Sequence, residues 1–168
     1  MNKYILLSSA AVLALVSFNA KAADSATGTA QVEVVKAFDI THVTGKSLDF
    51  GRVFAKAGTI SIAANDGAVT DNDGLELTGS TPARDEFEIT GPVGQTATIS
   101  LPSTSVTING SGTAAGESLT VSGLALSQNS VTPADANAIK IYVGGSLSVL
   151  TTTKPGPYSG TYTVNISY

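Results

Sequence analysis

Cysteine and tryptophan are absent from this chain of 168 residues, and histidine occurs only once, as His42. Without cysteine the fold contains no disulfide bond, although an exported protein would be permitted one. Zinc sites need several Cys or His ligands, so a metal centre of that kind is excluded. General base catalysis most often uses histidine, and with no identifiable partner His42 is expected to be an ordinary surface or half-buried residue. We therefore expect neither an enzyme nor a bound cofactor.

Long apolar runs are also missing, except near the N-terminus. There Lys3 precedes an apolar stretch over 4–18, and Ala20-Lys21-Ala22 has the small-x-small pattern of a cleavage site. Residues 1–22 are therefore predicted to be a cleaved signal peptide, which leaves 23–168 as the mature chain. The alternative is a retained anchor helix, which needs about 20 apolar residues; this stretch stops short of that length.

Basic residues are few. Removing the signal peptide takes away Lys3 and Lys21 but no acidic residue, so nine basic residues become seven against thirteen acidic ones, a formal charge of −6. Binding to nucleic acid needs clustered Lys and Arg, and none of these residues forms a run. We expect no nucleic-acid partner, and we expect export to a bacterial periplasm and then to the cell surface or beyond.

The mature chain is predicted to be one all-β domain. A chain of about 150 residues can bury enough surface for a single core, and no linker rich in proline, glycine or charge divides it. Short alternating runs separated by turn residues favour a β-sandwich. Outside the signal peptide no stretch of ten residues has clean helical periodicity, although a short helical turn is predicted at 133–137 within a polar loop over 127–137.

The alternating runs give the positions of the expected strands. They are 29–40, 47–54, 59–63, 68–70, 75–78, 83–90, 96–101, 106–108, 118–126, 138–143, 146–150 and 160–168. Turns are expected at Asn109-Gly110 and Gly144-Gly145. The last run is the most regular and places Tyr162, Val164, Ile166 and Tyr168 on one face. Such a strand has to pair with something, because an unpaired apolar edge invites association.

Two groups of charged residues are candidates for a binding site. Asp66, Asp71, Asp73 and Glu76 lie close in sequence and carry the oxygen ligands that calcium prefers. Their spacing does not match an EF-hand loop, and solvated hairpin tips are the favoured interpretation. The second group, at 84–88, is expected to be the solvated outer face of a strand, with Glu86 and Glu88 opposite the apolar residues.

Three motifs, in order along the chain, resemble a known family. They are Leu48-Asp49-Phe50-Gly51, Val143-Gly144-Gly145-Ser146-Leu147, and Gly156-Pro157-Tyr158-Ser159-Gly160-Thr161-Tyr162 with the residues that follow it. Together they resemble a family of exported bacterial domains of unknown function, which are similar to the pilin subunits of archaic chaperone–usher fimbriae, including the spore-coat-U-like group. The resemblance covers essentially the whole mature chain.

The resemblance implies an immunoglobulin-like, pilin-like sandwich that lacks one strand. In such pilins the N-terminal segment of a neighbouring subunit fills the gap, by β-strand addition. Carried over to this chain, residues 23–36 would contain the donor strand, with Ala30, Val32 and Val34 as donor side chains. Tyr162, Val164, Ile166 and Tyr168 would line the acceptor edge or the adjoining core. A periplasmic chaperone and an outer-membrane usher would be partners, together with identical or related subunits.

Two departures from the family keep an alternative open. Many archaic pilins carry a cysteine pair, which is missing here, and the tail before the first expected strand is short. Residues 30–36 would then be an ordinary strand of a complete sandwich. In that case the protein would be a self-contained secreted or periplasmic binding module rather than a fimbrial subunit for cell adhesion.

Overall fold

Short antiparallel strands make up nearly all of the regular structure. The computed structural model describes residues 24–168, and the predicted signal peptide lies outside them. The strands are β1 (Asp39–His42), β2 (Gly58–Ile62), β3 (Val69–Asp71), β4 (Asp85–Thr90), β5 (Ala97–Ser100), β6 (Val106–Gly110), β7 (Ser118–Leu126), β8 (Ser130–Val131), β9 (Ile139–Val149), β10 (Tyr158–Ser159) and β11 (Asn165–Ser167). Within the described residues the one helical element is a 3₁₀ turn, η1 (Gly112–Ala114).

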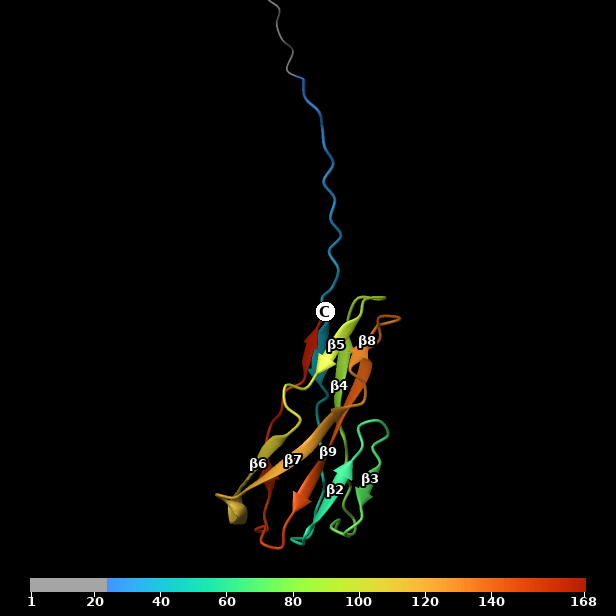
Figure 1. Ribbon diagram of the computed structural model, residues 1–168. Coiled ribbons are helices and arrows are strands. Elements are labelled where there is room, and N and C mark those ends of the chain that lie inside the picture. Colours follow the sequence, from blue (N-terminus) through green and yellow to red (C-terminus); the bar gives the residue numbers. More distant parts are fainter. Residues whose placement is uncertain (1–23) are drawn as a thin grey trace, which may run out of the picture. The chain divides into compact units, whose positions relative to one another are not determined.

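The strands form two sheets. The larger follows the order β1-β4-β9-β7-β6-β10, with β2 joining β9 and β3 joining β2; the smaller has the order β11-β5-β8. Figure 1 shows β5 and β8 close to the C-terminus, with β2 and β3 toward the opposite end of β9. All pairings are antiparallel. The predicted all-β sandwich is therefore confirmed.

β9 is the central strand of the larger sheet. Its first half pairs with β4, from Ile139↔Ile89 to Val143↔Asp85, and its second half pairs with β2, from Gly145↔Ile62 to Val149↔Gly58. The change of partner occurs at Gly144, where an added Cβ would collide with the backbone around Ile62. The predicted turn at Gly144-Gly145 is therefore wrong: the glycines let two strands meet one continuous strand.

The core has two clusters of buried side chains. One lies under β2, β7 and the second half of β9 and includes Ile60, Leu75 and Val149. The other lies between β4, β5 and the first half of β9 and includes Ile89, Ile99 and Ile141. Phe87 and Val164 pack against both clusters. Alternation therefore identified the inward residues even where a strand was shorter than expected.

Several predicted elements differ from those observed. The run at 47–54 contains only isolated bridges, Asp49↔Ala83 and Val53↔Glu76. The helical turn at 133–137 is absent, and the loop at 127–137 contains β8. Strand β6 continues through Asn109-Gly110, and the chain reverses around η1 instead. None of the helices in residues 24–168 has the length and hydropathy needed to cross a membrane.

The largest difference is at the N-terminal end. Residues 24–38 contain no strand, so the strand predicted over 29–40 is wrong except for its last two residues, which open β1. Residues 34–168 form one unit and residues 24–33 belong to another, so each is described by itself. Val32 of the first unit and Val34 at the start of the second are exposed, by 87% and 88% of the possible area.

Candidate functional site: an apolar groove with unpaired edges

The inner face of the larger sheet is hollowed beside β6, β7 and the second half of β9, where Leu147 and Val149 are buried and the other apolar lining residues named below are half-buried. A groove of about 850 Å³ opens there, over β6, β7 and the second half of β9. The apolar side chains on its floor and walls include Leu48, Val53, Ile108, Leu119, Leu147 and Val149. Two irregular segments, 47–55 and 153–160, bound it. The lining is thus largely apolar, like the inner face of a sandwich.

Edge segment 47–55 contains the Leu48-Asp49-Phe50-Gly51 motif, and its geometry explains the residue types. Asp49 pairs with Ala83 through both backbone groups, at 2.8 and 2.7 Å, and its carboxylate accepts a hydrogen bond from the Gly51 N–H at 2.7 Å. Phe50 is buried in the core, whereas Leu48 packs beside the groove. Gly51 has a positive φ of 70° and no room for a Cβ because of Ser80, so only glycine fits.

The same segment has one paired edge and one unpaired edge. The backbone groups of Asp49, Arg52 and Phe54 bond to residues 75–83. Those of Leu48, Phe50 and Val53 point the other way and form no backbone hydrogen bond within residues 24–168. These backbone groups would therefore be free to form hydrogen bonds with an extended chain lying in the groove.

The C-terminal segment offers the second edge. Tyr158 and Ser159 pair with β6, and Asn165–Ser167 pairs with β5, so the chain crosses from the larger to the smaller sheet between them. Over this crossing, residues 160–164 form no backbone–backbone hydrogen bond in the described chain. We call these residues edge segment 160–164. Tyr162 and Val164 are half-buried and the residues around them exposed, and none of the five pairs with a strand, although Gly160 lies close to Thr107 and Ile108 of β6.

The predicted acceptor residues occupy different environments. Tyr162, Val164 and Ile166 are half-buried and pack on the two core clusters, as the alternation predicts. Tyr168 is mostly exposed, and its ring lies 5.2 Å from that of Phe38. The groove floor itself comes from β6, β7 and β9, which the motif-based prediction did not name. Their alternating apolar residues carried the necessary pattern, but it was indistinguishable from ordinary core.

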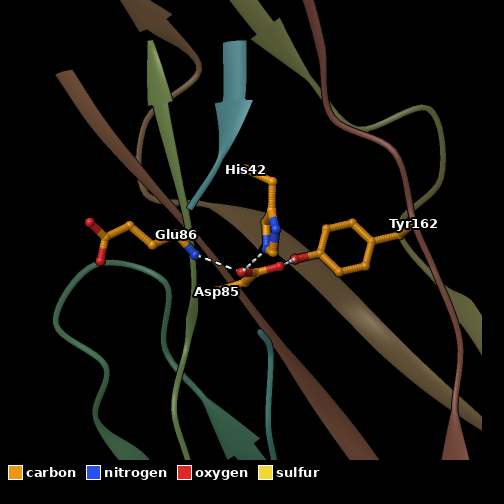
Figure 2. A network of polar contacts seen from close by, with 4 residues as sticks. All are labelled: His42, Asp85, Glu86 and Tyr162. Carbon is orange, nitrogen blue, oxygen red and sulfur yellow. Dashed lines mark hydrogen bonds and ion pairs between the residues drawn. The ribbon is translucent and has the colours of Figure 1, made fainter. Parts of the chain in front are cut away.

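A buried polar network lies beside Tyr162 (Figure 2). Its centre is Asp85 on β4, which is 4% exposed. The Tyr162 hydroxyl donates to Oδ2 at 2.5 Å, the Glu86 N–H donates to Oδ1 at 2.8 Å, and Nε2 of His42 lies 2.7 Å from Oδ1. His42 therefore has a partner that sequence could not reveal, because 43 residues separate the two.

Glu86 is also buried, which corrects the expectation of a solvated face at 84–88. It stays on the outer face, opposite Phe87, but its register neighbour is Tyr142. The Arg84 guanidinium lies 3.6 Å above the centre of the Tyr142 ring, and Lys140 Nζ lies 2.6 Å from Oε1 of Glu86. That carboxylate raises the pKa of Lys140. Neighbouring long side chains thus cover a carboxylate that the alternation pattern places outside.

In the acidic turns, aspartate side chains accept hydrogen bonds from backbone N–H groups. Both carboxylate oxygens of Asp71 accept N–H groups, from Leu75 at 2.9 Å and Glu76 at 2.6 Å. Asp73 accepts the Thr59 N–H at 3.0 Å, and Asp66 accepts that of Ala68 at 2.9 Å. No cluster of three metal-ligating side chains occurs in residues 24–168. These carboxylates serve the turns in which they lie.

A family model described as a domain of unknown function, DUF4402, matches residues 38–168. The chain is a member of the DUF4402 family. The groove, both of its edge segments and the Asp85 network all lie within the DUF4402 match, whereas residues 24–37 precede it. The expected membership in a domain family of unknown function is thereby confirmed, and the likeness to archaic pilins stays a prediction. Neither the curated proteins nor the solved structures include a significant match.

Proposed function

We propose that this protein is a structural, pilin-like subunit that assembles into a surface fimbrium by donor-strand exchange. The observation that carries the proposal is the apolar groove between segments 47–55 and 153–160, beside backbone groups that have no partner in the described chain. Those groups belong to Leu48, Phe50 and Val53 and to edge segment 160–164, which continues from the groove. A strand laid in the groove and continued along 160–164 would bond to them and cover the apolar floor. Recognition of this kind takes its affinity from the backbone and its specificity from alternate side chains.

The chain itself carries a segment with the right pattern. Ala30, Val32 and Val34 fall on one face of an extended chain, and Val32 and Val34 are almost fully exposed. Burying a valine side chain stabilises by up to about 1.5–3 kcal/mol. The exposed valines and the partly exposed apolar walls of the groove therefore complement each other, and a second copy of the chain would supply what the first lacks.

The position of the groove favours head-to-tail assembly. The groove lies along the second half of β9 and the loops at 53–55 and 153–157. Residues 34–38 lead into β1, which lies beside the C-terminal end of β4, and this part of β4 pairs with the start of β9. Residues 34–38 and the groove thus belong to opposite ends of β9. Contacts between two different surfaces of this kind produce open chains rather than closed dimers.

Export and delivery complete the proposal. The predicted signal peptide would take the chain to the periplasm, where an uncovered groove is an aggregation hazard. By the resemblance to archaic pilins, a periplasmic chaperone would lend a strand to the groove until an outer-membrane usher exchanges it for the next subunit's donor.

The test uses two adjacent valines. Val34→Asp places a charge on the proposed donor face, whereas the matched control Val35→Asp places the same charge on the opposite face. Because an unpaired buried charge is costly, V34D is expected to reduce polymer by about tenfold or more, and V35D far less. Subunits exported to a periplasm would be measured by light scattering after size exclusion, by unheated SDS gels and by electron microscopy.

Other outcomes would contradict the proposal. Equal loss in V34D and V35D would mean that the segment does not insert with alternating faces. A wild-type protein that remains a monodisperse monomer, without any chaperone, would point to the self-contained binding module, with the groove taking an extended segment of another protein.

A further inference from the structure

The Asp85 network connects the unpaired C-terminal edge to the sandwich interior. Tyr162 lies at the centre of edge segment 160–164, and its hydroxyl makes the one side-chain hydrogen bond of that segment in the described chain. The acceptor, Asp85, is on β4 and buried; β4 in turn pairs with β1 and β9. Figure 2 shows His42 and Tyr162 approaching the same carboxylate from different segments.

Aromatic contacts fix the same three elements. The Phe87 ring of β4 lies 6.3 Å from the Tyr162 ring and 5.0 Å from the His42 ring, in edge-on geometry with both. Burial, followed by the hydrogen bond to Asp85, raises the pKa of Tyr162. The hydroxyl therefore remains a donor throughout the physiological range. Because the backbone of 160–164 has no ladder to hold it, this side chain holds the middle of the segment, and Val164 packs its end against the core.

We propose that Tyr162, acting through Asp85 and supported by His42, is a positioning residue that fixes edge segment 160–164 in place to receive an incoming strand. Its effect on strand binding rests on the proposed function; its effect on the segment itself does not. A strand can pair only with an edge whose backbone groups are already aligned, so an anchored edge loses less conformational freedom on binding.

The variants are conservative. Tyr162→Phe removes only the hydroxyl, and Asp85→Asn keeps an oxygen acceptor without its charge. Tyr142→Phe is the matched control, because it removes the same hydroxyl from a half-buried tyrosine on β9 that lies under Arg84 and outside the groove lining. All are made in the full mature chain carrying Val34→Asp, which removes self-assembly, and the probe is a labelled peptide of residues 24–37.

We expect Tyr162→Phe to weaken peptide affinity about tenfold, the scale of one hydrogen bond to a charged group. Asp85→Asn should give a smaller loss, and Tyr142→Phe almost none. A purely structural hydroxyl would lower the free energy of unfolding without changing peptide affinity in the folded protein, and that result would overturn the proposal.

A second measurement is independent of the peptide. Backbone order parameters from NMR relaxation are about 0.85 in rigid segments and below about 0.6 in flexible ones. Tyr162→Phe should lower them at residues 160–164 and leave β6 unchanged. Unchanged values at 160–164 would overturn the proposal. If they fall as expected while no variant binds the peptide, the positioning role stands and the proposed occupant of the groove is wrong.

Discussion

Asp71 shows how one side chain organises a turn at the residue scale. Its two carboxylate oxygens accept hydrogen bonds from the N–H groups of Leu75 and Glu76, which hold the chain as it leaves β3. The Glu76 and Leu75 N–H groups, in that order, lower the pKa of Asp71 from its usual 3.8. The ionised form is thus the one that the folded turn prefers.

Asp71→Asn should therefore reduce stability in a pH-dependent way. Since the folded pKa is lowered, the contribution of Asp71 is complete above the unfolded value of 3.8 and is lost as pH falls through the folded pKa. The difference in urea midpoint between wild type and D71N should be largest near about pH 7 and shrink below about pH 4. Asp66→Asn is the control, because Asp66 accepts one N–H group, that of Ala68, and the amide oxygen of asparagine can keep that bond. A difference that grows in acid would contradict this account.

At the scale of elements, β9 determines how the larger sheet is built. One strand of eleven residues serves β4, β2 and β7, and the exchange of β4 for β2 requires close backbone contact at Gly144. An added methyl group there meets carbonyl and amide atoms of residues 62–64, which cannot rotate away as a side chain could.

Gly144→Ala should destabilise the fold by about 1–3 kcal/mol, the usual cost of overpacking. Gly145→Ala is the matched neighbour, because its Cβ would meet the ends of Leu124, Val121 and Leu48 at 3.1–3.3 Å, and those side chains can adjust. Denaturant unfolding of both variants measures the difference. Equal effects would show that β2 can move away from β9.

The sequence alone predicted the elements best where one face of a strand packs on the core and the other is exposed to solvent. The run at 118–126 matches β7 residue for residue, because its alternation is set by contact with the core. Prediction from the sequence failed at Gly144-Gly145, where a dipeptide typical of turns instead allows close packing of two strands. It also failed at 29–40, where the residues alternate but no neighbouring strand is present in the described chain. Period-two patterns report which face is apolar, but not whether a partner is present in the same molecule.

The candidate site was predictable only in part, for a related reason. Local patterns gave the valines of the N-terminal segment and the alternating residues 162–166. The groove floor and the Asp85–His42 contact arise from residues far apart in the chain, and nothing local distinguishes them. Buried Asp85 and Glu86 resembled surface charge because a sequence does not show which side chains will cover them.

At the scale of the whole molecule, one donor and one acceptor per subunit define an open polymer. Under the proposed function, a subunit without residues 24–36 retains its groove but has no strand to give. It can therefore add at one end of a growing chain and blocks further growth there.

Mixing such a truncated subunit with wild type should shorten the filaments as its fraction rises. Equal parts should reduce the mean length to a few subunits, because about every second addition is then terminal. Filament lengths in electron micrographs measure this, with truncated protein carrying Leu48→Asp as the control that neither gives nor accepts a strand. Filament lengths that do not change as the truncated subunit is added would contradict a polymer with one donor and one acceptor per subunit.

Phe38 and Tyr168 are the first and last residues of the family match, yet their rings lie side by side, with centroids 5.2 Å apart. Domains with neighbouring ends tolerate circular permutation. Joining Tyr168 to Phe38 by a short linker, and opening a new start in the exposed loop at 134–137, would keep every strand pairing while changing the order in which the strands are made. The fold would then depend on which strands are neighbours in the sheets, and not on the position in the sequence at which the chain begins.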